Sequence, residues 1–477
     1  MFERTRHRIE VGWLPSVGVP DWVRVGVEGA GAILALLAAW QGVVWLTALP
    51  VVLLPGPVDV AAATSAHLGT VVRDASYTGR EIVLGWLAGV GTGVALALCM
   101  AASRRLRLFL YPSLLAVRIV PLVVFAPVFI VVLGPTLEMR ILLAAILSFF
   151  PVVVATLDGL QSVPEAQVAL LQSVGASRWQ RLVHVHLPNA LPSAVAGVKI
   201  ATPLAVEGVV IAEFLAASNG VGHGMVTAAD RLDTPLLFGY MLVLIAIGLT
   251  VFVGVIALDR ALSWGDGDAF ATDHLWTPAT ASVTGYATTV AVTGLAVASL
   301  VVGWQFAATV VPHARLFLAG PLDVVAVLAG APDLFLAATV ATMQKLAAGW
   351  ALGATVGITV GAVAALVPRL RTGVYTYLVG FRVMPVIAFA PILLVWFGVS
   401  FAAGAVLVAA AVFFPIAIGM ATGLRRLPDE QRELFRLVAA PPHRTALVRL
   451  RYAAPTLLAG CKLSIVTGFS GAIVAEW

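Results

Sequence analysis

Charged residues are scarce in this sequence of 477 residues: Asp, Glu, Lys and Arg together make up 11% of it. A soluble domain carries roughly 25%, so the composition excludes an ordinary soluble protein. Its two cysteines, Cys99 and Cys461, both fall in apolar segments, which argues against a disulfide framework. Lysine is nearly as rare, and none of Lys199, Lys345 and Lys462 follows a glycine-rich loop. The chain is therefore not expected to bind ATP through a P-loop.

Long apolar runs fill the sequence instead. Hydrophobic residues make up 60% of the chain, and its mean hydropathy is +1.00. Several runs approach or exceed the roughly 20 residues that a helix needs to cross a bilayer. Because lipid offers no partner for a free N–H or C=O, the runs are predicted to be helical, and they lack the two-residue alternation of a membrane barrel. They cover 30–49, 82–102, 112–133, 141–157 and 235–258.

The sequence also repeats its motifs at a constant distance. The Phe-Ala-Pro motif at 125–127 returns 264 positions later, and the Gly-Pro, Gly-Trp and Phe-Phe-Pro motifs keep the same offset. Towards the end the offset falls to 263, so that Lys199 matches Lys462 and Glu213 matches Glu476; a single deletion in the second copy accounts for this. The register predicts a duplicated domain, and such halves often form a pathway between them. We place the halves at 1–265 and 266–477, with a linker at 263–278.

Six helices are predicted in the first half and about five in the second. The second copy stops at Trp477, the counterpart of Phe214, so its last helix is expected to be absent from this sequence. The predicted fold class is an all-α polytopic membrane protein with a duplicated domain and about 11 helices. The helices are predicted at 28–54, 80–102, 110–133, 138–158, 190–215 and 235–260, then at 284–311, 341–366, 373–397, 402–423 and 454–476.

Arginines cluster in the short segments between the apolar runs. Arg4, Arg6 and Arg8 precede the first predicted helix, and further groups follow the second and fourth helices. Cytoplasmic loops are enriched in Lys and Arg, so the N-terminus and these loops are predicted to be cytoplasmic. The same rule explains the net charge of +5 without a nucleic acid partner. We expect a multi-pass protein of the plasma membrane, surrounded by lipid.

One cytoplasmic segment, at 158–188, is too long for a simple turn between two helices. It contains Gly175, Ala176 and Ser177, and then Val185, His186, Leu187 and Pro188. This spacing resembles the coupling loop of binding-protein-dependent ABC importer permeases, whose pattern is E-A-A, three residues, G, nine residues and I-x-L-P. Gly175 takes the place of the glycine, Val185 that of the isoleucine, and Leu187 and Pro188 form the ending. Ala-Leu-Leu at 169–171 stands where E-A-A belongs.

The second copy keeps a different part of the same pattern. Glu433 takes the acidic position, Ala439 replaces the glycine, and Val448 and Leu450 follow after the one-residue deletion. A glycine allows a tight turn between two short helices, and the resulting knob is expected to enter a groove on a partner. In the family that the chain resembles, this partner is an ATPase. The order of Pro121 and the repeated motifs looks most like the nitrate, sulfonate and taurine branch.

The resemblance implies a set of partners. Two cytoplasmic ATPase subunits would bind ATP and Mg²⁺, an extracytoplasmic solute-binding protein would deliver the solute, and this chain would hold no cofactor itself. Sulfonates, nitrate, taurine and pyrimidine-type vitamin precursors are all compatible as solutes. The alternative is a secondary transporter or channel that needs no ATPase, which leaves both loops as coincidences. A membrane-embedded enzyme is disfavoured because the sequence offers no convincing catalytic group.

Ionisable residues within the predicted spans are the candidates for a solute pathway. Arg118 and Arg382 stand at equivalent positions, and their guanidinium groups could meet an anion; alternatively both lie near the cytoplasmic end and extend into the interface. Glu207 is a second candidate, because its counterpart is a serine. Glu213 and Glu476 are expected to form hydrogen bonds within the bundle. His184 and His186 lack acidic or cysteine neighbours, so no metal site is predicted.

Overall fold

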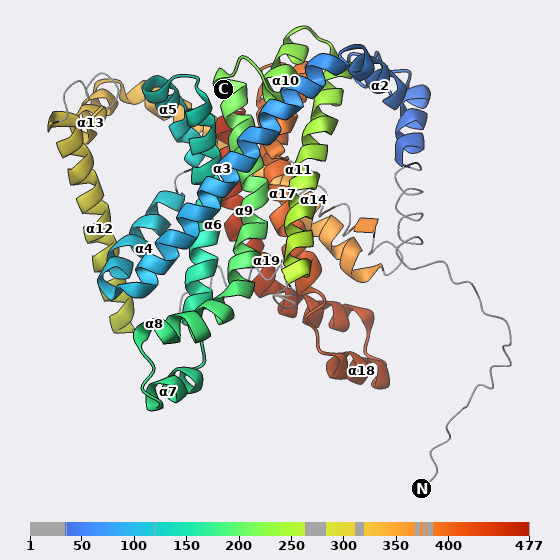
Figure 1. Ribbon diagram of the computed structural model, residues 1–477. Coiled ribbons are helices and arrows are strands. Elements are labelled where there is room, and N and C mark those ends of the chain that lie inside the picture. The colour runs from blue at the N-terminus through green and yellow to red at the C-terminus, as the bar shows by residue number, and fades with distance from the viewer. Residues whose placement is uncertain are drawn as a thin grey trace.

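A computed structural model shows a bundle of helices that fall into two related halves (Figure 1). It describes residues 34, 36–119, 121–262, 283–310, 319–367, 373, 374, 378 and 385–476. Every regular element within these ranges is helical. The predicted linker at 263–278, the arginines of the N-terminus and Arg382 lie outside the described residues, and the boundary between the halves at 265 stays a prediction.

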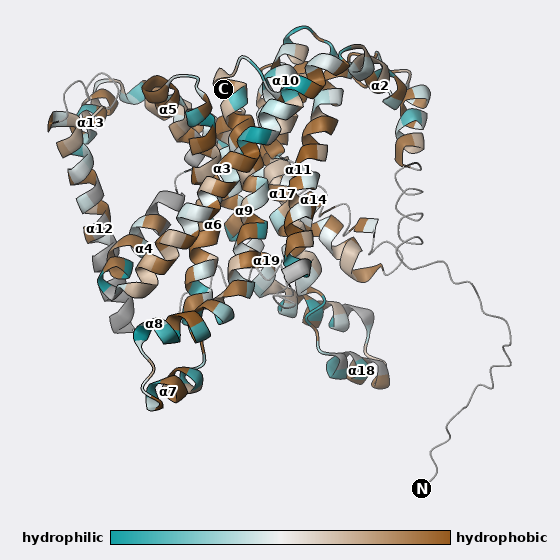
Figure 2. Ribbon diagram, in the orientation of Figure 1, coloured by the Kyte–Doolittle hydropathy of each residue, from teal (hydrophilic) through white to brown (hydrophobic). Residues whose placement is uncertain are grey.

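Seven helical segments of the described chain are long and apolar enough to cross a bilayer. Figure 2 shows hydrophobic residues along them. Hydrophilic residues lie at one end, around α8 (Arg178–Arg181) and α18 (Asp429–Leu437). The all-α, duplicated membrane architecture predicted from the sequence is confirmed. In the first half the spans are α3 (Leu68–Ala102), α6 (Leu137–Gln161), α9 (Leu187–Ala216) and α11 (Thr234–Leu262). In the second they are α14 (Pro332–Leu366), α17 (Phe401–Gly423) and α19 (Pro442–Val474).

The third predicted helix of the first half is interrupted. In place of one helix over 110–133, the chain forms α4 (Arg104–Ile119), the short η1 (Leu122–Phe125) and α5 (Ala126–Leu133). Proline has no N–H to donate to the preceding turn, so Pro121 ends the regular hydrogen bonding and Pro127 fits the first turn of α5. The second half repeats this break with η5 (Val386–Phe389) and α16 (Ala390–Phe397).

Glycines bring the first two spans of each half into backbone contact. A Cβ placed on Gly89 of α3 would lie 2.8 Å from the carbonyl oxygen of Ala145 in α6. Gly353 of α14 stands in the same relation to Ala409 of α17, at 2.6 Å. Small residues let membrane helices approach closely, because dispersion contacts rather than water drive their association. This packing fixes the frame that both loops extend from.

Each half contributes elements that pack against the other half. α12 (Val283–Val310) of the second half packs against α4 of the first, and the indole N–H of Trp396 donates to the carbonyl oxygen of Leu53 at 2.6 Å. η5 lies against α9, and η1 lies against α19. One buried core therefore contains residues of both halves, among them Ile211 and Ile392.

The change of offset between the copies has a structural counterpart. α8 (Arg178–Arg181) runs through η2 (Leu182–His186), a π-helical turn, into α9, whereas α19 covers the equivalent stretch as one α-helix. A π turn holds one residue more than an α turn does. The sequence comparison shows one residue fewer in the second copy. In the structure, the π turn of the first copy holds this additional residue.

The polar connections separate to the two ends of the bundle. α7 (Glu165–Ser173) and α18 (Asp429–Leu437) project from one end, as Figure 1 shows. At the opposite end lie α2 (Pro57–Ala66), α10 (Val221–Asp230) and α13 (Pro321–Gly330). The two loops that resemble coupling loops therefore share one face of the protein.

Candidate functional site

The first loop is a knob of two short helices that meet at Gly175. α7 ends in a Schellman motif: the amide of Ala176 donates to the carbonyl oxygen of Leu171 at 2.9 Å, and that of Gly175 to Gln172 at 3.0 Å. This motif needs a left-handed residue after the helix, and Gly175 has a φ of +75°. The residue that the sequence pattern singled out is thus the one that turns the chain.

The return of the loop is also fixed by local hydrogen bonds. Ser177 and Gln180 form a capping box at the start of α8, with bonds of 3.2 and 2.8 Å. Nδ1 of His186 lies 3.0 Å from the carbonyl oxygen of Leu160 at the end of α6. Val185 belongs to the π turn, and Leu187 and Pro188 open α9. Movement of the knob would therefore act directly on the ends of two spans.

The tip of the first knob exposes apolar side chains outside the bundle. Leu170, Val174 and Trp179 are 66%, 72% and 71% exposed. Contiguous exposed apolar groups at the end of a protein commonly mark a binding surface, and tryptophan is enriched at the energetic centre of such surfaces. The knob therefore has the properties of a docking element for another protein.

The second loop has the same backbone but a different turn residue. After α18, the amide of Ala440 donates to the carbonyl oxygen of Phe435 at 2.9 Å, as in the first Schellman motif. Ala439 stands in the left-handed position, with a φ of +46°. Leu437 and Val438 are 84% and 62% exposed, and Glu433 is exposed on α18, while Val448 and Leu450 lie in the first turns of α19.

Ala439 should be a strained position. A left-handed conformation costs roughly 1–2 kcal/mol for a residue with a Cβ, so Ala439→Gly should slow amide hydrogen exchange in residues 429–441 by about threefold or more. The control is Gly175→Ala, which should have the opposite effect on residues 165–177. Equal exchange in the native chain and in Ala439→Gly would show that the turn carries no strain.

The three candidate residues for the solute pathway differ in where they lie. Arg118 lies in α4, and Arg382 falls outside the described residues. Glu207 lies on α9, half-buried, and among the described residues no hydrogen bond or ion pair reaches its carboxylate. Neighbouring positions of α9 face other elements: Thr202 accepts from Trp86 of α3 at 3.1 Å, and Gly208 packs on α6. α9 also lies against η5 of the second half.

Other charged side chains at the spans have partners on neighbouring elements. Lys199 donates to Asp259 of α11 at 2.6 Å, an ion pair that ties α9 to α11. The expected hydrogen bonding inside the bundle is observed for Glu213, which accepts from Thr78 at 2.6 Å. Glu476 accepts from Thr342 at 2.8 Å, but at an exposed position. Glu213 belongs to a larger cluster of buried polar side chains, which the sequence did not predict because its members lie far apart in the chain.

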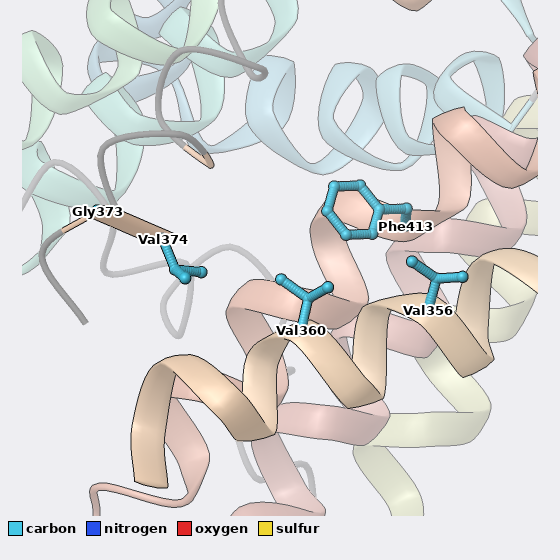
Figure 3. Close-up of a pocket in the computed structure, with 5 residues that line it drawn as sticks. All are labelled: Val356, Val360, Gly373, Val374 and Phe413. Carbon is cyan, nitrogen blue, oxygen red and sulfur yellow. The ribbon is translucent and has the colours of Figure 1, made fainter. Parts of the chain in front are cut away.

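A pocket of about 480 Å³ lies away from both knobs. Figure 3 shows Val356 and Val360 of α14 facing Val374 and Phe413, and Gly373 completes the lining. Its lining side chains are all apolar, so the pocket offers no side-chain partner to a polar solute. Within the described chain, no group of three or more His, Cys, Asp or Glu residues comes together as a metal site.

Comparison with known proteins gives the two halves one relationship. Residues 89–264 and 357–477 match the family described as binding-protein-dependent transport system inner membrane component. A probable ABC transporter permease of Haemophilus influenzae is 31% identical over 229 residues, which are 48% of this chain and 94% of that protein.

Two other relatives carry solutes in their names. The formylaminopyrimidine transport permease of Halalkalibacterium halodurans is 28% identical over 230 residues, 48% of this chain and 92% of its own. The taurine transport system permease of Escherichia coli is 29% identical over 245 residues, 50% of this chain and 89% of its own. Each of these relatives matches about half of this chain.

Proposed function

The chain belongs to the family of inner membrane components of binding-protein-dependent transport systems, and from this premise we propose that it is the permease of an ATP-driven importer of a small solute. Its two fused halves would form, or nearly form, the translocation pathway. As a multi-pass transport protein of this family it works with other subunits, and in this proposal the N-terminus and both knobs face the cytoplasm.

The observation that carries the proposal is the pair of knobs. Both have the same Schellman turn, both expose apolar side chains, and both project from one end of the bundle. Two equivalent knobs suit two ATPase subunits. ATP and Mg²⁺ would bind to those subunits, because the sequence of this chain lacks a P-loop lysine. Docking on Gly175–Pro188 and on the loop from Glu433 to Arg451 would pass movement to α6, α9, α17 and α19.

The solute is proposed only by class. Taurine and formylaminopyrimidine are the named solutes of two relatives, and small anions such as sulfonate, taurine or nitrate are our leading candidates. An extracytoplasmic binding protein would select the solute and deliver it at the end where α10 lies. Arg118, Arg382 and Glu207 are the proposed pathway residues, of which Glu207 lies on α9, a helix that contacts η5 of the second half.

Reconstitution tests the importer against its alternative. The chain, with candidate ATPase subunits and binding protein in liposomes, should take up solute only when ATP is present on the knob side. Uptake that follows an ion gradient, without ATP and without any associated ATPase, would instead establish the secondary transporter or channel. Uptake in both conditions would contradict obligatory coupling to ATP.

Glu207→Ser, which copies Ser470 of the second half, should raise the uptake of an anionic solute. An unpaired carboxylate facing the pathway repels an anion by about 1 kcal/mol at short range, which corresponds to about a fivefold change in rate. Initial uptake rates at several nitrate concentrations measure it. Glu138→Ser, which removes an exposed glutamate at the start of α6, should leave the rates unchanged. Equal rates for the native chain and Glu207→Ser would place Glu207 outside the pathway.

A further inference from the structure

A cluster of buried polar side chains lies at the end of the first half opposite to the knobs. It joins α3, α6, α9 and α11, and Glu81 and Glu213 in it are 0% and 1% exposed. Charges in membrane spans are costly unless they are paired or hydrogen-bonded, so a cluster of this size needs a reason. Its members are Asp74, Thr78, Glu81, Arg140, Glu213 and Tyr240.

The cluster satisfies the first amides of α10. The N–H of Val221 donates to Thr78 at 2.8 Å, that of Gly222 to Glu213 at 2.6 Å, and that of Gly220 to Asp74 at 3.4 Å. The first four N–H groups of a helix have no partner within the helix and carry a partial positive charge. Side chains from three positions on other spans therefore hold the start of α10 in place.

α10 passes this positioning to the other half. It packs against α16, and the shared core contains Val221 and Met225 of α10 together with Ile392 of α16. The cluster thus decides where α10 meets the second half at the end of the bundle opposite to the knobs. In the proposed importer, this contact between the halves would lie at the outer end of the pathway.

A single cation compensates the glutamates of this cluster. Nε of Arg140 lies 3.2 Å from Oε1 of Glu81, and Nη1 of Arg140 donates to the side-chain oxygen of Asn219 at 3.3 Å, just before α10. Without Arg140, the three buried carboxylates of Asp74, Glu81 and Glu213 would stand together with no positive side chain among the members of the cluster. Arg140 is therefore the residue on which the cluster depends.

The second half places its cation on a different helix. Glu476, the counterpart of Glu213, accepts from Lys345 at 3.0 Å and from Thr342 at 2.8 Å. Lys345 stands at the position of Glu81, and Gly404 stands at the position of Arg140. A Cβ placed on Gly404 would lie 3.0 Å from Cδ of Lys345. The lysine therefore occupies the space that an arginine would need at 404.

We propose that Arg140 and Lys345 are equivalent positioning residues that act from different helices: Lys345 pairs directly with Glu476, whereas Arg140 pairs with Glu81 in the cluster that contains Glu213. Each so holds the outer end of its half, and Arg140 thereby sets α10 against α16. The two arrangements, Glu81 with Arg140 and Lys345 with Gly404, are alternative solutions to the same requirement. Either arrangement satisfies the requirement when both of its residues are present. A combination of one residue from each arrangement does not.

Amide hydrogen exchange of the purified full chain in lipid nanodiscs tests this directly. Arg140→Gly should raise exchange in residues 219–230 by about tenfold or more, because breaking a buried ion pair leaves uncompensated charge. The double variant Glu81→Lys with Arg140→Gly, which installs the arrangement of the second half, should return exchange to within about threefold of the native chain. Exchange in residues 349–361 of α14 should be unchanged in both, which separates a local effect from global unfolding.

Three results would overturn the proposal. They are native exchange in Arg140→Gly, a double variant no better than Arg140→Gly, and a loss of protection that spreads equally to α14. The mirror comparison uses the second half: Lys345→Glu should loosen residues 468–476, and Lys345→Glu with Gly404→Arg should restore them. The measurement needs neither ATPase nor solute, so its failure would leave the proposed transport function untouched.

Discussion

Replacing Gly175 with arginine should abolish the binding of an ATPase subunit to the first knob while the membrane bundle stays folded. The substitution forces a residue with a Cβ into a left-handed conformation, at a cost of roughly 1–2 kcal/mol, and adds a charge beside the exposed apolar tip. No atom lies within 4 Å of a Cβ built on Gly175, so the bundle itself is not disturbed. Co-purification with the ATPase should fall at least about tenfold.

Gly398→Arg is the matched control. Gly398 also has a positive φ, of +62°, and open space around its Cβ, but it precedes α17 at the end opposite to α18. The backbone cost is therefore at least as large as at Gly175, because a φ of +62° with a ψ of −168° is a conformation essentially confined to glycine, while the face of the protein differs. Equal loss of the ATPase in both variants would show that strain alone disrupts the complex, and no loss in Gly175→Arg would contradict docking at this knob.

Gly89→Leu should have the largest effect on stability. A Cβ there would overlap the hydroxyl of Ser148 and lie 2.8 Å from the carbonyl oxygen of Ala145, which is backbone and cannot turn away. Overpacking of a tight core costs about 1–3 kcal/mol for extra methylene groups, and here α3 would have to separate from α6. We expect a loss of at least about 3 kcal/mol, or failure to fold, as measured by thermal unfolding in detergent and by size-exclusion chromatography.

The same helix supplies the comparison for this experiment. Gly91, two residues further on, has no atom within 4 Å of a Cβ and lies on the exposed side of α3. Gly91→Leu removes the same kind of residue from the same helix and adds the same side chain. Its unfolding temperature should stay within a few degrees of the native value. A similar fall in both variants would mean that helix propensity, rather than contact with α6, decides the outcome.

The repeat, the helical membrane fold and the first loop could all be predicted from the sequence. Hydropathy identifies apolar runs directly, and the repeat is visible in motifs that keep one offset. The left-handed turn at Gly175 could also be expected, because a glycine there fits the end of a short helix. Nothing in the sequence indicates that Ala439 adopts the same conformation, since alanine normally favours a right-handed helix.

Hydropathy failed where polar residues are buried. It placed the start of the second helix at residue 80, whereas α3 begins at Leu68, because Asp74 and Thr78 lie inside the cluster rather than in water. It also read 110–133 as one span, because apolar residues continue past Pro121 while the hydrogen bonding does not. The cluster itself joins Glu81 to Arg140 across 59 positions and Asp74 to Tyr240 across 166, separations that no local pattern reports.

The π turn at η2 kept the rest of its helix from rotating. One additional residue in an α-helix would turn everything after it by about 100°, which would move Lys199 away from Asp259 and Glu213 away from α10. Because five residues absorb the change, Glu213 keeps a bond to Thr78 that matches the bond of Glu476 to Thr342 in the other copy. The two copies could therefore come to differ in length beside the knob while the same sides of their helices still faced the same neighbours.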